Sequence, residues 1–252
     1  MLSGQCYIDY YQVFHYNISI TNKGVYIVRI IAIEGLDKAG KKTSTDTLEL
    51  FFNHTNIKVA RYSLPNYNKP IGKLIKDWLN GDFEADAKVF ELLQTADKQY
   101  AQEFIKKCED DDVDVLIMDR YIHSLLAYGA YDNNEDWLEE LTKHMRMPDT
   151  VIYLDVEPEV SMHRNGKFGD NDKYESDLDR LRSTGETYKR ILKGDVRIVD
   201  ANKPPLIVKS RVLQIGIDIY EEMMDRQIEG NTKRKFITPK EKDLIKLYNA
   251  FN

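Results

Sequence analysis

A strand that turns directly into a glycine-rich loop and then a helix constrains this chain more than any other feature of its sequence. Residues 28–35 read VRIIAIEG, a nearly continuous apolar run that leads into the pattern G-x-x-x-x-G-K between Gly35 and Lys41. Such a run is typical of a strand covered on both faces of a parallel sheet. The two glycines permit a tight backbone path, and the N–H groups that open the following helix face an anion. The pattern predicts a phosphate-binding loop, and an ordinary strand-to-helix turn is the alternative.

The residue after Gly40-Lys41 departs from the usual form of this loop. A Ser or Thr whose hydroxyl binds magnesium normally stands there, and this chain has Lys42 instead. Thr43 is a poor direct replacement, because one residue is about a hundred degrees of rotation around a helix. Two interpretations stay open: a working loop with weakened magnesium affinity, or a loop that binds nucleotide without turnover.

Four further apolar runs of strand length follow, at residues 57–63, 114–120, 150–156 and 196–201. Segments with helical spacing lie between or after them, including residues 42–52, 70–80, 90–107 and 206–224. Strands and helices that alternate in this way predict an α/β fold with a doubly wound, parallel, five-stranded sheet flanked by helices. Ligands of such sheets bind outside the carboxyl ends of the strands.

Composition excludes several classes of protein. The formal net charge of -6 over 252 residues argues against a broad nucleic-acid surface, so we expect a small anionic partner at a local cluster of cations. Cys6 and Cys108 lie far apart without the spacing of a disulfide framework or a zinc site, which favours a reducing, cytoplasmic setting. The start of the chain does not read as a signal peptide, and no apolar run reaches the length of a membrane helix.

The two ends of the chain are predicted to be additions to one main domain. Residues 1–27 are rich in Tyr without a clear period, and we treat them as an N-terminal extension of unknown role. Residues 28–226 hold all the strand and helix signals of the main domain. Residues 227–252 form a polar linker and an amphipathic helix with a capping box from Thr238 to Glu241. This helix is expected to dock on its own domain, and binding to a partner is the alternative.

A second polar pair, Asp119-Arg120, follows the apolar run at residues 114–120. A carboxylate at the end of a strand beside a phosphate-binding loop usually orders magnesium and its waters. An adjacent Arg can hold a phosphate through two parallel hydrogen bonds. A surface ion pair is the alternative, and the buried strand before it argues against that interpretation.

Four motifs, in the same order, resemble those of the thymidylate kinase family. They are EGLDKAGKKT (34–43), LPNYNKPIGKLI (64–75), DRYIHSLLAYG (119–129) and RNGKFGDNDKYES (164–176). The resemblance spans residues 28–226 and implies a P-loop kinase fold with a lid segment. It also implies transfer of the γ-phosphoryl group of ATP to dTMP with Mg²⁺, and a homodimer.

The same resemblance implies roles for individual residues. The catalytic set is Asp37, Lys38, Lys41 and Arg120. The ATP site takes Gly35, Ala39, Gly40, Lys41, Lys42, Thr43, Ser44, Arg164, Lys167 and Lys173. The dTMP site takes Asp37, Arg61, Gln94, Lys98, Arg120, Ser124, Tyr128 and Tyr174. Mg²⁺ is expected to be held through water by Asp119 and Asp37.

This sequence departs from the family where the base should bind. Gln94 stands in place of a Phe that stacks on thymine, Lys98 in place of an Arg, and Gly129 in place of a Gln. The Arg expected shortly before LPNY falls near Ser63, with Arg61 two positions upstream on the same strand face. Besides dTMP, two alternatives therefore stay open: a different or modified deoxynucleoside monophosphate as acceptor, or a nucleotide-binding protein with impaired turnover.

Overall fold

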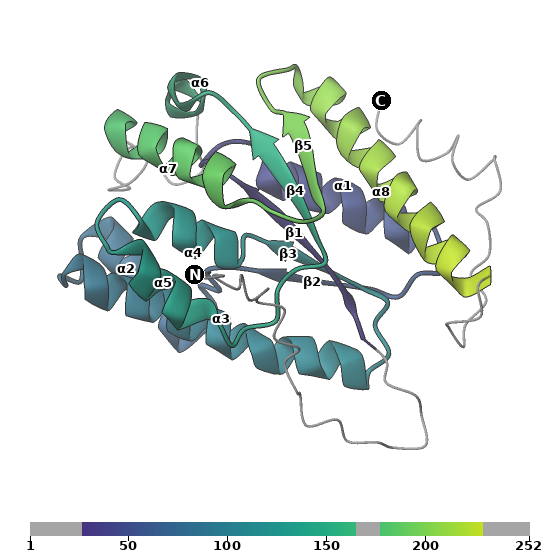
Figure 1. Cartoon of the computed structure of the whole chain (residues 1–252), viewed down its shortest axis with the longest axis horizontal. Coiled ribbons are helices and arrows are strands. Elements are labelled where there is room, and N and C mark those ends of the chain that lie inside the picture. Colours follow the sequence, from purple (N-terminus) through teal and green to yellow (C-terminus); the bar gives the residue numbers. More distant parts are fainter. Residues whose placement is uncertain (1–26, 165–176, 229–252) are drawn as a thin grey trace, which may run out of the picture.

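The structure is a computed structural model that describes residues 27–164 and 177–228. Its five strands form one sheet in the order β2-β3-β1-β4-β5, and all neighbours pair in parallel (Figure 1). The strands are β1 (Arg29–Gly35), β2 (Val59–Ser63), β3 (Val115–Asp119), β4 (Thr150–Asp155) and β5 (Val196–Asp200). This topology confirms the predicted doubly wound sheet, and each strand lies inside one of the five apolar runs.

Helices connect the strands and cover both faces of the sheet. They are α1 (Lys41–Asn53), α2 (Pro70–Asn80), α3 (Ala87–Asp110), α4 (Ile122–Gly129), α5 (Glu135–Thr142), α6 (Pro158–His163), α7 (Leu178–Ile191) and α8 (Pro205–Ile228). In Figure 1, α1 and α8 run side by side on one side of the sheet, and α3, α4 and α5 lie on the other. None of the helices in the described ranges combines the length and the apolar character that crossing a membrane requires.

Alternation along β1 produces a core on each face of the sheet, because successive side chains of a strand point to opposite sides. Ile31 and Ile33 join a cluster with the buried side chains of α1 and α8. Ile30 and Ala32 join a second cluster with the buried side chains of α3. Both faces of β1 are therefore apolar until its last two residues, where the chain turns toward the site.

Local signals explain where most helices begin. The side chain of Asp86 accepts a hydrogen bond from the Val89 amide at 2.8 Å and caps α3. Pro70 occupies the first turn of α2, where its missing N–H costs nothing. α1 differs, since its N-cap is Gly40 and no side chain caps it. A helix N-terminus without a side-chain cap keeps its first amide groups for another acceptor.

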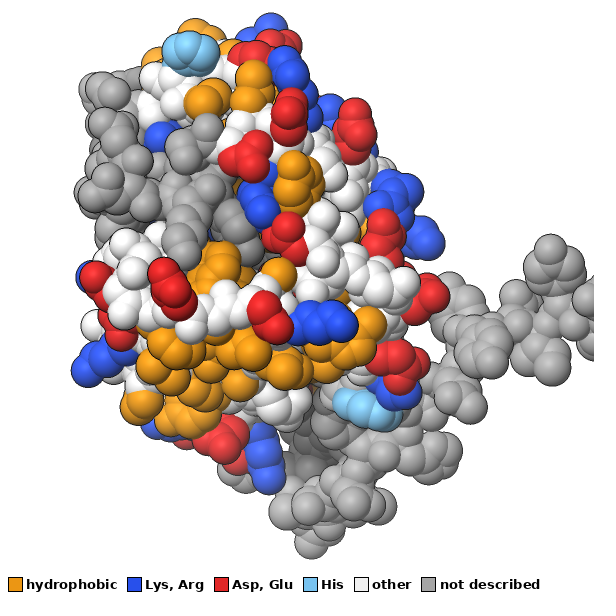
Figure 2. Space-filling view, turned by 90° about the vertical axis from the view of Figure 1, so that its left-hand side faces the viewer, with side chains coloured by type: hydrophobic (Ala, Val, Ile, Leu, Met, Phe, Trp, Pro, Cys, Tyr) orange, Lys and Arg blue, Asp and Glu red, His pale blue; other side chains and the backbone are white. Residues whose placement is uncertain are grey.

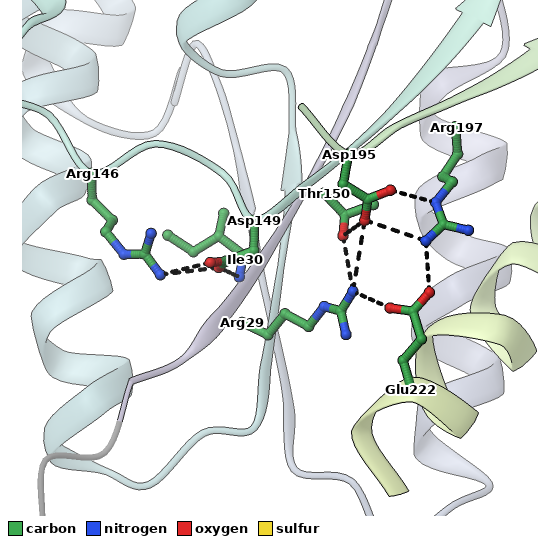
Figure 3. Close-up of polar contacts among 8 residues, drawn as sticks. All are labelled: Arg29, Ile30, Arg146, Asp149, Thr150, Asp195, Arg197 and Glu222. Atoms are coloured by element: carbon green, nitrogen blue, oxygen red, sulfur yellow. Dashed lines mark hydrogen bonds and ion pairs between the residues drawn. The ribbon is translucent and has the colours of Figure 1, made fainter. Parts of the chain in front are cut away.

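An ion-pair cluster joins β1, β4, β5 and α8 at the amino end of the sheet (Figure 3). Arg29 donates to Thr150 at 3.2 Å and to Glu222 at 2.7 Å. Arg197 also pairs with Glu222 at 2.6 Å, while Thr150 donates to Asp195 at 2.8 Å. These contacts fasten α8 to the sheet at the end opposite the carboxyl ends of the strands.

Several predicted features lie outside the described residues. They are the N-terminal extension apart from residue 27, the C-terminal amphipathic helix, and the lid residues Lys167, Lys173 and Tyr174. The domain boundaries and the roles given to these three residues stay predictions.

Candidate active site

The loop between β1 and α1 follows the path that its glycines permit. Gly35 has φ +145°, and a Cβ there would lie 2.7 Å from the carbonyl oxygen of Leu154 in β4, so no side chain can be accommodated. Gly40 has φ +101°, in the region that favours glycine. Lys38, at φ 59°, takes a left-handed conformation without being a glycine. Non-glycine residues in this region gather at functional sites, where the surrounding structure holds them.

Lys41 folds back over this loop. Its Nζ donates to the carbonyl oxygens of Gly35 at 3.0 Å and Leu36 at 2.5 Å. Burial lowers the pKa of Lys41 to about 8, and Arg120 acts in the same direction, whereas Asp37 raises it. The loop therefore holds a buried ammonium group at its centre, and its hydrogen bonds to the described residues go to carbonyl oxygens that an anion can replace.

α6 and the residue after it support the loop from the side of β4. Ser161 donates its hydroxyl to the Asp37 carbonyl at 2.5 Å. Arg164 donates to the carbonyl oxygens of Lys38 at 3.2 Å and Ala201 at 2.7 Å. Arg164, which the resemblance assigns to ATP, thus lies against the backbone of the phosphate-binding loop.

Arg120 comes directly after β3 and reaches the same loop. It has φ 65°, and its Nη1 donates to the Gly35 carbonyl and to the Ser124 hydroxyl, each at 3.2 Å. Its Nη2 forms an ion pair with Asp37, and its guanidinium lies 5.1 Å from the centre of the Tyr128 ring. Burial acts to lower the pKa of Arg120, but the Asp37 carboxylate holds it well above its ordinary value.

Asp37 lies between the loop and Tyr128. The Tyr128 hydroxyl donates to Oδ2 of Asp37 at 2.7 Å, while Oδ1 faces Arg120. Burial raises the pKa of Asp37, yet the charges of Arg120 and Lys41 outweigh that effect and hold the pKa below its ordinary value. Each carboxylate oxygen of Asp37 therefore has one partner among the described residues, and each keeps a lone pair for a further donor.

A buried carboxylate that the sequence analysis did not assign fixes the turn after β3. Glu34 is fully buried and accepts hydrogen bonds from the amide of Tyr121 at 2.8 Å and the hydroxyl of Ser124 at 2.5 Å. The Tyr188 hydroxyl of α7 donates to it at 3.0 Å. Since Arg120 precedes Tyr121, Glu34 positions the arginine indirectly. An acidic residue inside the apolar run at 28–35 was the signal for it.

A pocket opens beside Arg120, between α3 and α4. Its lining residues are Asp37, Pro65, Tyr67, Leu79, Phe90, Glu91, Gln94, Arg120, Ser124, Leu125 and Tyr128. The structure thus brings together five residues predicted for the acceptor nucleotide, namely Asp37, Gln94, Arg120, Ser124 and Tyr128. Lys98 is buried behind this wall, and its Nζ donates to Oε1 of Gln94 at 3.0 Å. Phe90 and Glu91 were missed, because helical spacing alone does not tell which face of α3 meets a pocket.

Arg61 and Lys42 are not among the residues that line that pocket. Arg61 pairs with two carboxylates of α1, Asp46 at 2.5 Å and Glu49 at 3.4 Å, and it approaches Asp119 to 3.9 Å. The Lys42 side chain is 60% exposed and pairs with Asp46 at 2.8 Å. Lys42 therefore points to solvent, away from the inside of the phosphate-binding loop.

Asp119, one of the two carboxylates predicted to hold Mg²⁺ through water, ends β3 beside the loop. Burial raises its pKa, although Lys41 and Arg120 act to lower it. Within the described part of the chain, no group of three or more His, Cys, Asp or Glu side chains could hold a metal ion. Mg²⁺ in kinases is usually bound by one or two carboxylates together with waters and substrate phosphates. The single carboxylate of Asp119 fits an ion that arrives with a nucleotide.

Comparison with known proteins places this geometry in a family. The sequence model described as Thymidylate kinase matches residues 33–212. The chain belongs to the thymidylate kinase family. A protein of Saccharolobus solfataricus named probable thymidylate kinase 1 is 32% identical over 203 residues, which cover 77% of this chain and 97% of the relative. The thymidylate kinase of Plasmodium falciparum is 28% identical over 204 residues, covering 80% and 92%.

A solved structure of thymidylate kinase from Candida albicans has the same fold. It matches with a TM-score of 0.63 over 84% of this chain and 97% of the other, at 24% sequence identity. Membership in the family confirms the resemblance carried by the four motifs. It implies a kinase that binds nucleotides, while the particular acceptor and the roles of single residues stay predictions.

Proposed function

We propose that this protein phosphorylates dTMP to dTDP with ATP and Mg²⁺. The observation that supports this most is the position of Arg120. On one side it contacts the phosphate-binding loop at Gly35 and Asp37, and on the other it contacts Ser124 and Tyr128 in the pocket. A guanidinium between a donor site and an acceptor site can bind the acceptor's phosphate where it faces the γ-phosphoryl group.

Each part of the loop has a role in this reaction. The first amides of α1 and the loop from Gly35 to Ser44 would bind the ATP phosphates. The Nζ of Lys41 would exchange the carbonyl oxygens of Gly35 and Leu36 for outer phosphate oxygens, which restores a strong partner for a buried charge. Phosphoryl transfer requires little covalent work from a protein, so alignment and positive charge supply the catalysis.

Arg120 and Asp37 form a pair that an acceptor phosphate would reorganise. The N–H group that Arg120 gives to Asp37 is suited to a phosphate oxygen, and Asp37 would retain the Tyr128 hydroxyl. Asp119 would hold Mg²⁺ through its water shell. When bound, the ion neutralises charge on the β- and γ-phosphates of ATP.

A second acceptor is favoured by one observation. The pocket wall formed by α3 carries Gln94, where a stacking aromatic ring is expected, and the neighbouring Glu91 is also polar. A polar wall suits a deoxynucleoside monophosphate with another or a modified base. A nucleotide-binding protein without turnover is the third possibility, because Lys42 removes a metal ligand.

An acceptor screen tests the proposal. ADP release from ATP is measured in a coupled assay with dTMP, dUMP, dCMP and dGMP, each with and without Mg²⁺. We expect acceptor-dependent ADP release with dTMP. ADP release with another monophosphate but not with dTMP would show that this other monophosphate is the acceptor. No release with any acceptor would leave nucleotide binding without turnover.

The homodimer implied by the family has a candidate surface on α2 and α3. Leu74 of α2 and Val89 and Leu92 of α3 are each more than two-fifths exposed, at 43%, 41% and 48%. Figure 2 shows hydrophobic side chains gathered on the side of the molecule where these helices lie. We propose that a second copy covers this surface. Sedimentation of Leu92→Asp should then give a monomer, and a monomeric wild-type protein would contradict the proposal.

A further inference from the structure

Glu91 is a buried acid that the proposed reaction does not use. Glu91 is 2% exposed, and it lines the pocket from the inner face of α3. Within the described residues, Oε2 has no hydrogen-bond partner. A buried polar group without a partner costs about 1–3 kcal/mol, so such groups in folded proteins call for an explanation.

The neighbouring helix α4 leaves room for the carboxyl group of Glu91. A Cβ added at Gly129 of α4 would lie 3.0 Å from Cδ of Glu91 and 3.1 Å from Oε2. Glycine at position 129 therefore permits the acid where most side chains would displace it. Position 129 is also one at which the sequence departs from its family.

Gln94 continues the polar wall one turn along α3, since residues three apart lie on the same helix face. Its Oε1 accepts from Lys98 at 3.0 Å, so that oxygen is occupied. The Gln94 amide nitrogen is then the group available to a ligand. Side by side, the wall presents a carboxyl group at Glu91 and an N–H donor at Gln94.

We infer that Glu91 reads position 4 of the acceptor's pyrimidine ring, so that the site takes a 4-amino base as well as the 4-oxo base of dTMP. This rests on the proposed function of the pocket as the acceptor site. A carboxylate accepts a hydrogen bond from an exocyclic amino group such as N4 of cytosine, and Gln94 then donates to the neighbouring ring nitrogen. With thymine, a carboxylic acid at Glu91 would donate instead to the 4-oxo group, and Gln94 would have to turn its amide oxygen toward the ring N3–H, away from Lys98.

The charge state of Glu91 allows both modes. Burial raises the pKa of Glu91 to about 7. Lys98 on α3 and Arg180 on α7 act to lower that pKa, and Asp132, which follows α4, acts to raise it. Near neutral pH the acid therefore exists in both forms. Raising the pH ionises it and should favour the 4-amino base.

The test compares dCMP with dTMP in wild type and in Glu91→Gln. The ratio of kcat/KM for dCMP to that for dTMP is measured between about pH 6 and pH 8.5, on either side of the pKa. In wild type the ratio should rise with pH. In Glu91→Gln it should be independent of pH and about tenfold lower at high pH, because a hydrogen bond to a charged acceptor is stronger than one to an amide by about 1.4 kcal/mol. Glu103→Gln, an exposed acid on the same helix, is the matched control and should behave as wild type.

A second variant tests the inference even if Glu91→Gln does not fold. Gly129→Ala places a methyl group against the Glu91 carboxyl and should lower the same ratio while thermal unfolding shows an intact protein. An equal loss for both acceptors, or a ratio that neither variant changes, overturns the inference. If wild type releases no ADP with any acceptor, the kinase proposal fails by itself. Calorimetric binding of dCMP and dTMP to wild type and Glu91→Gln then decides: a Glu91-dependent preference supports the inference, and equal preferences refute it.

Discussion

Replacing Arg120 by Ala removes the group that joins the two halves of the site. The guanidinium contacts the Gly35 carbonyl, the Ser124 hydroxyl and the Asp37 carboxylate, and it stacks near the Tyr128 ring. In the reaction we expect it to hold the acceptor phosphate by charge-assisted hydrogen bonds, each worth about 1.5–3 kcal/mol. Loss of two such bonds, partly offset by water, corresponds to roughly two to three orders of magnitude in kcat/KM for the acceptor.

The same variant has a measurable effect on folding. Asp37 would lose its ion-pair partner and keep the hydrogen bond from Tyr128. An underpaired carboxylate costs about 1–3 kcal/mol, so thermal unfolding should occur at a lower temperature. Arg182→Ala is the matched control, since that exposed arginine of α7 pairs with Glu159 at 2.7 Å and neither residue lines the pocket. Kinetics are read from acceptor-dependent ADP release. If Arg120→Ala stays folded and its KM and kcat barely change, the phosphate-binding role is wrong.

Three further variants test single parts of the account. Lys42→Thr should lower the Mg²⁺ concentration for half-maximal rate and leave the acceptor KM unchanged. If the wild type reaches half-maximal rate at the same Mg²⁺ concentration as the variant, Lys42 does not weaken magnesium binding. Gln94→Phe should shift preference toward thymine through aromatic stacking, and an unchanged preference profile would show that position 94 does not contact the base. Deleting residues 1–24 should keep activity, since this segment holds none of the four motifs; a soluble but inactive truncation contradicts that expectation.

The sheet was predictable because buried parallel strands leave a clear trace in sequence. Residues 28–35 and 150–156 read as apolar runs, and β1 and β4 lie within them. β3 likewise lies within the run at residues 114–120 and ends one residue before the run does. Such runs follow from burial on both faces, which requires Val, Ile and Leu at successive positions. The runs alone do not give the order of the strands in the sheet. The position of the site was predicted from the general rule that ligands bind outside the carboxyl ends of parallel strands.

Parts of the site depended on packing that no local pattern reveals. Alternation along β2 puts Arg61 and Ser63 on the same face of the strand. It does not reveal that Arg61 contacts the carboxylates of α1, nor that it does not line the pocket. The place of Glu91 in the pocket wall was equally hidden from the sequence, because the room for its carboxyl group is left by Gly129 on another helix. For Lys42 a local contact explains the direction of the side chain, because Asp46, one turn further along α1, pairs with it on the exposed face.

The fate of the γ-phosphoryl group tests the central claim most directly. ATP labelled in the γ-phosphate is mixed with excess protein, Mg²⁺ and dTMP, and the products of a single turnover are separated by ion exchange. The account predicts that the label appears in dTDP in step with ADP, and that Arg120→Ala slows this transfer while Arg182→Ala does not. Label released only as inorganic phosphate, or retained in ATP with every acceptor tested, would contradict it.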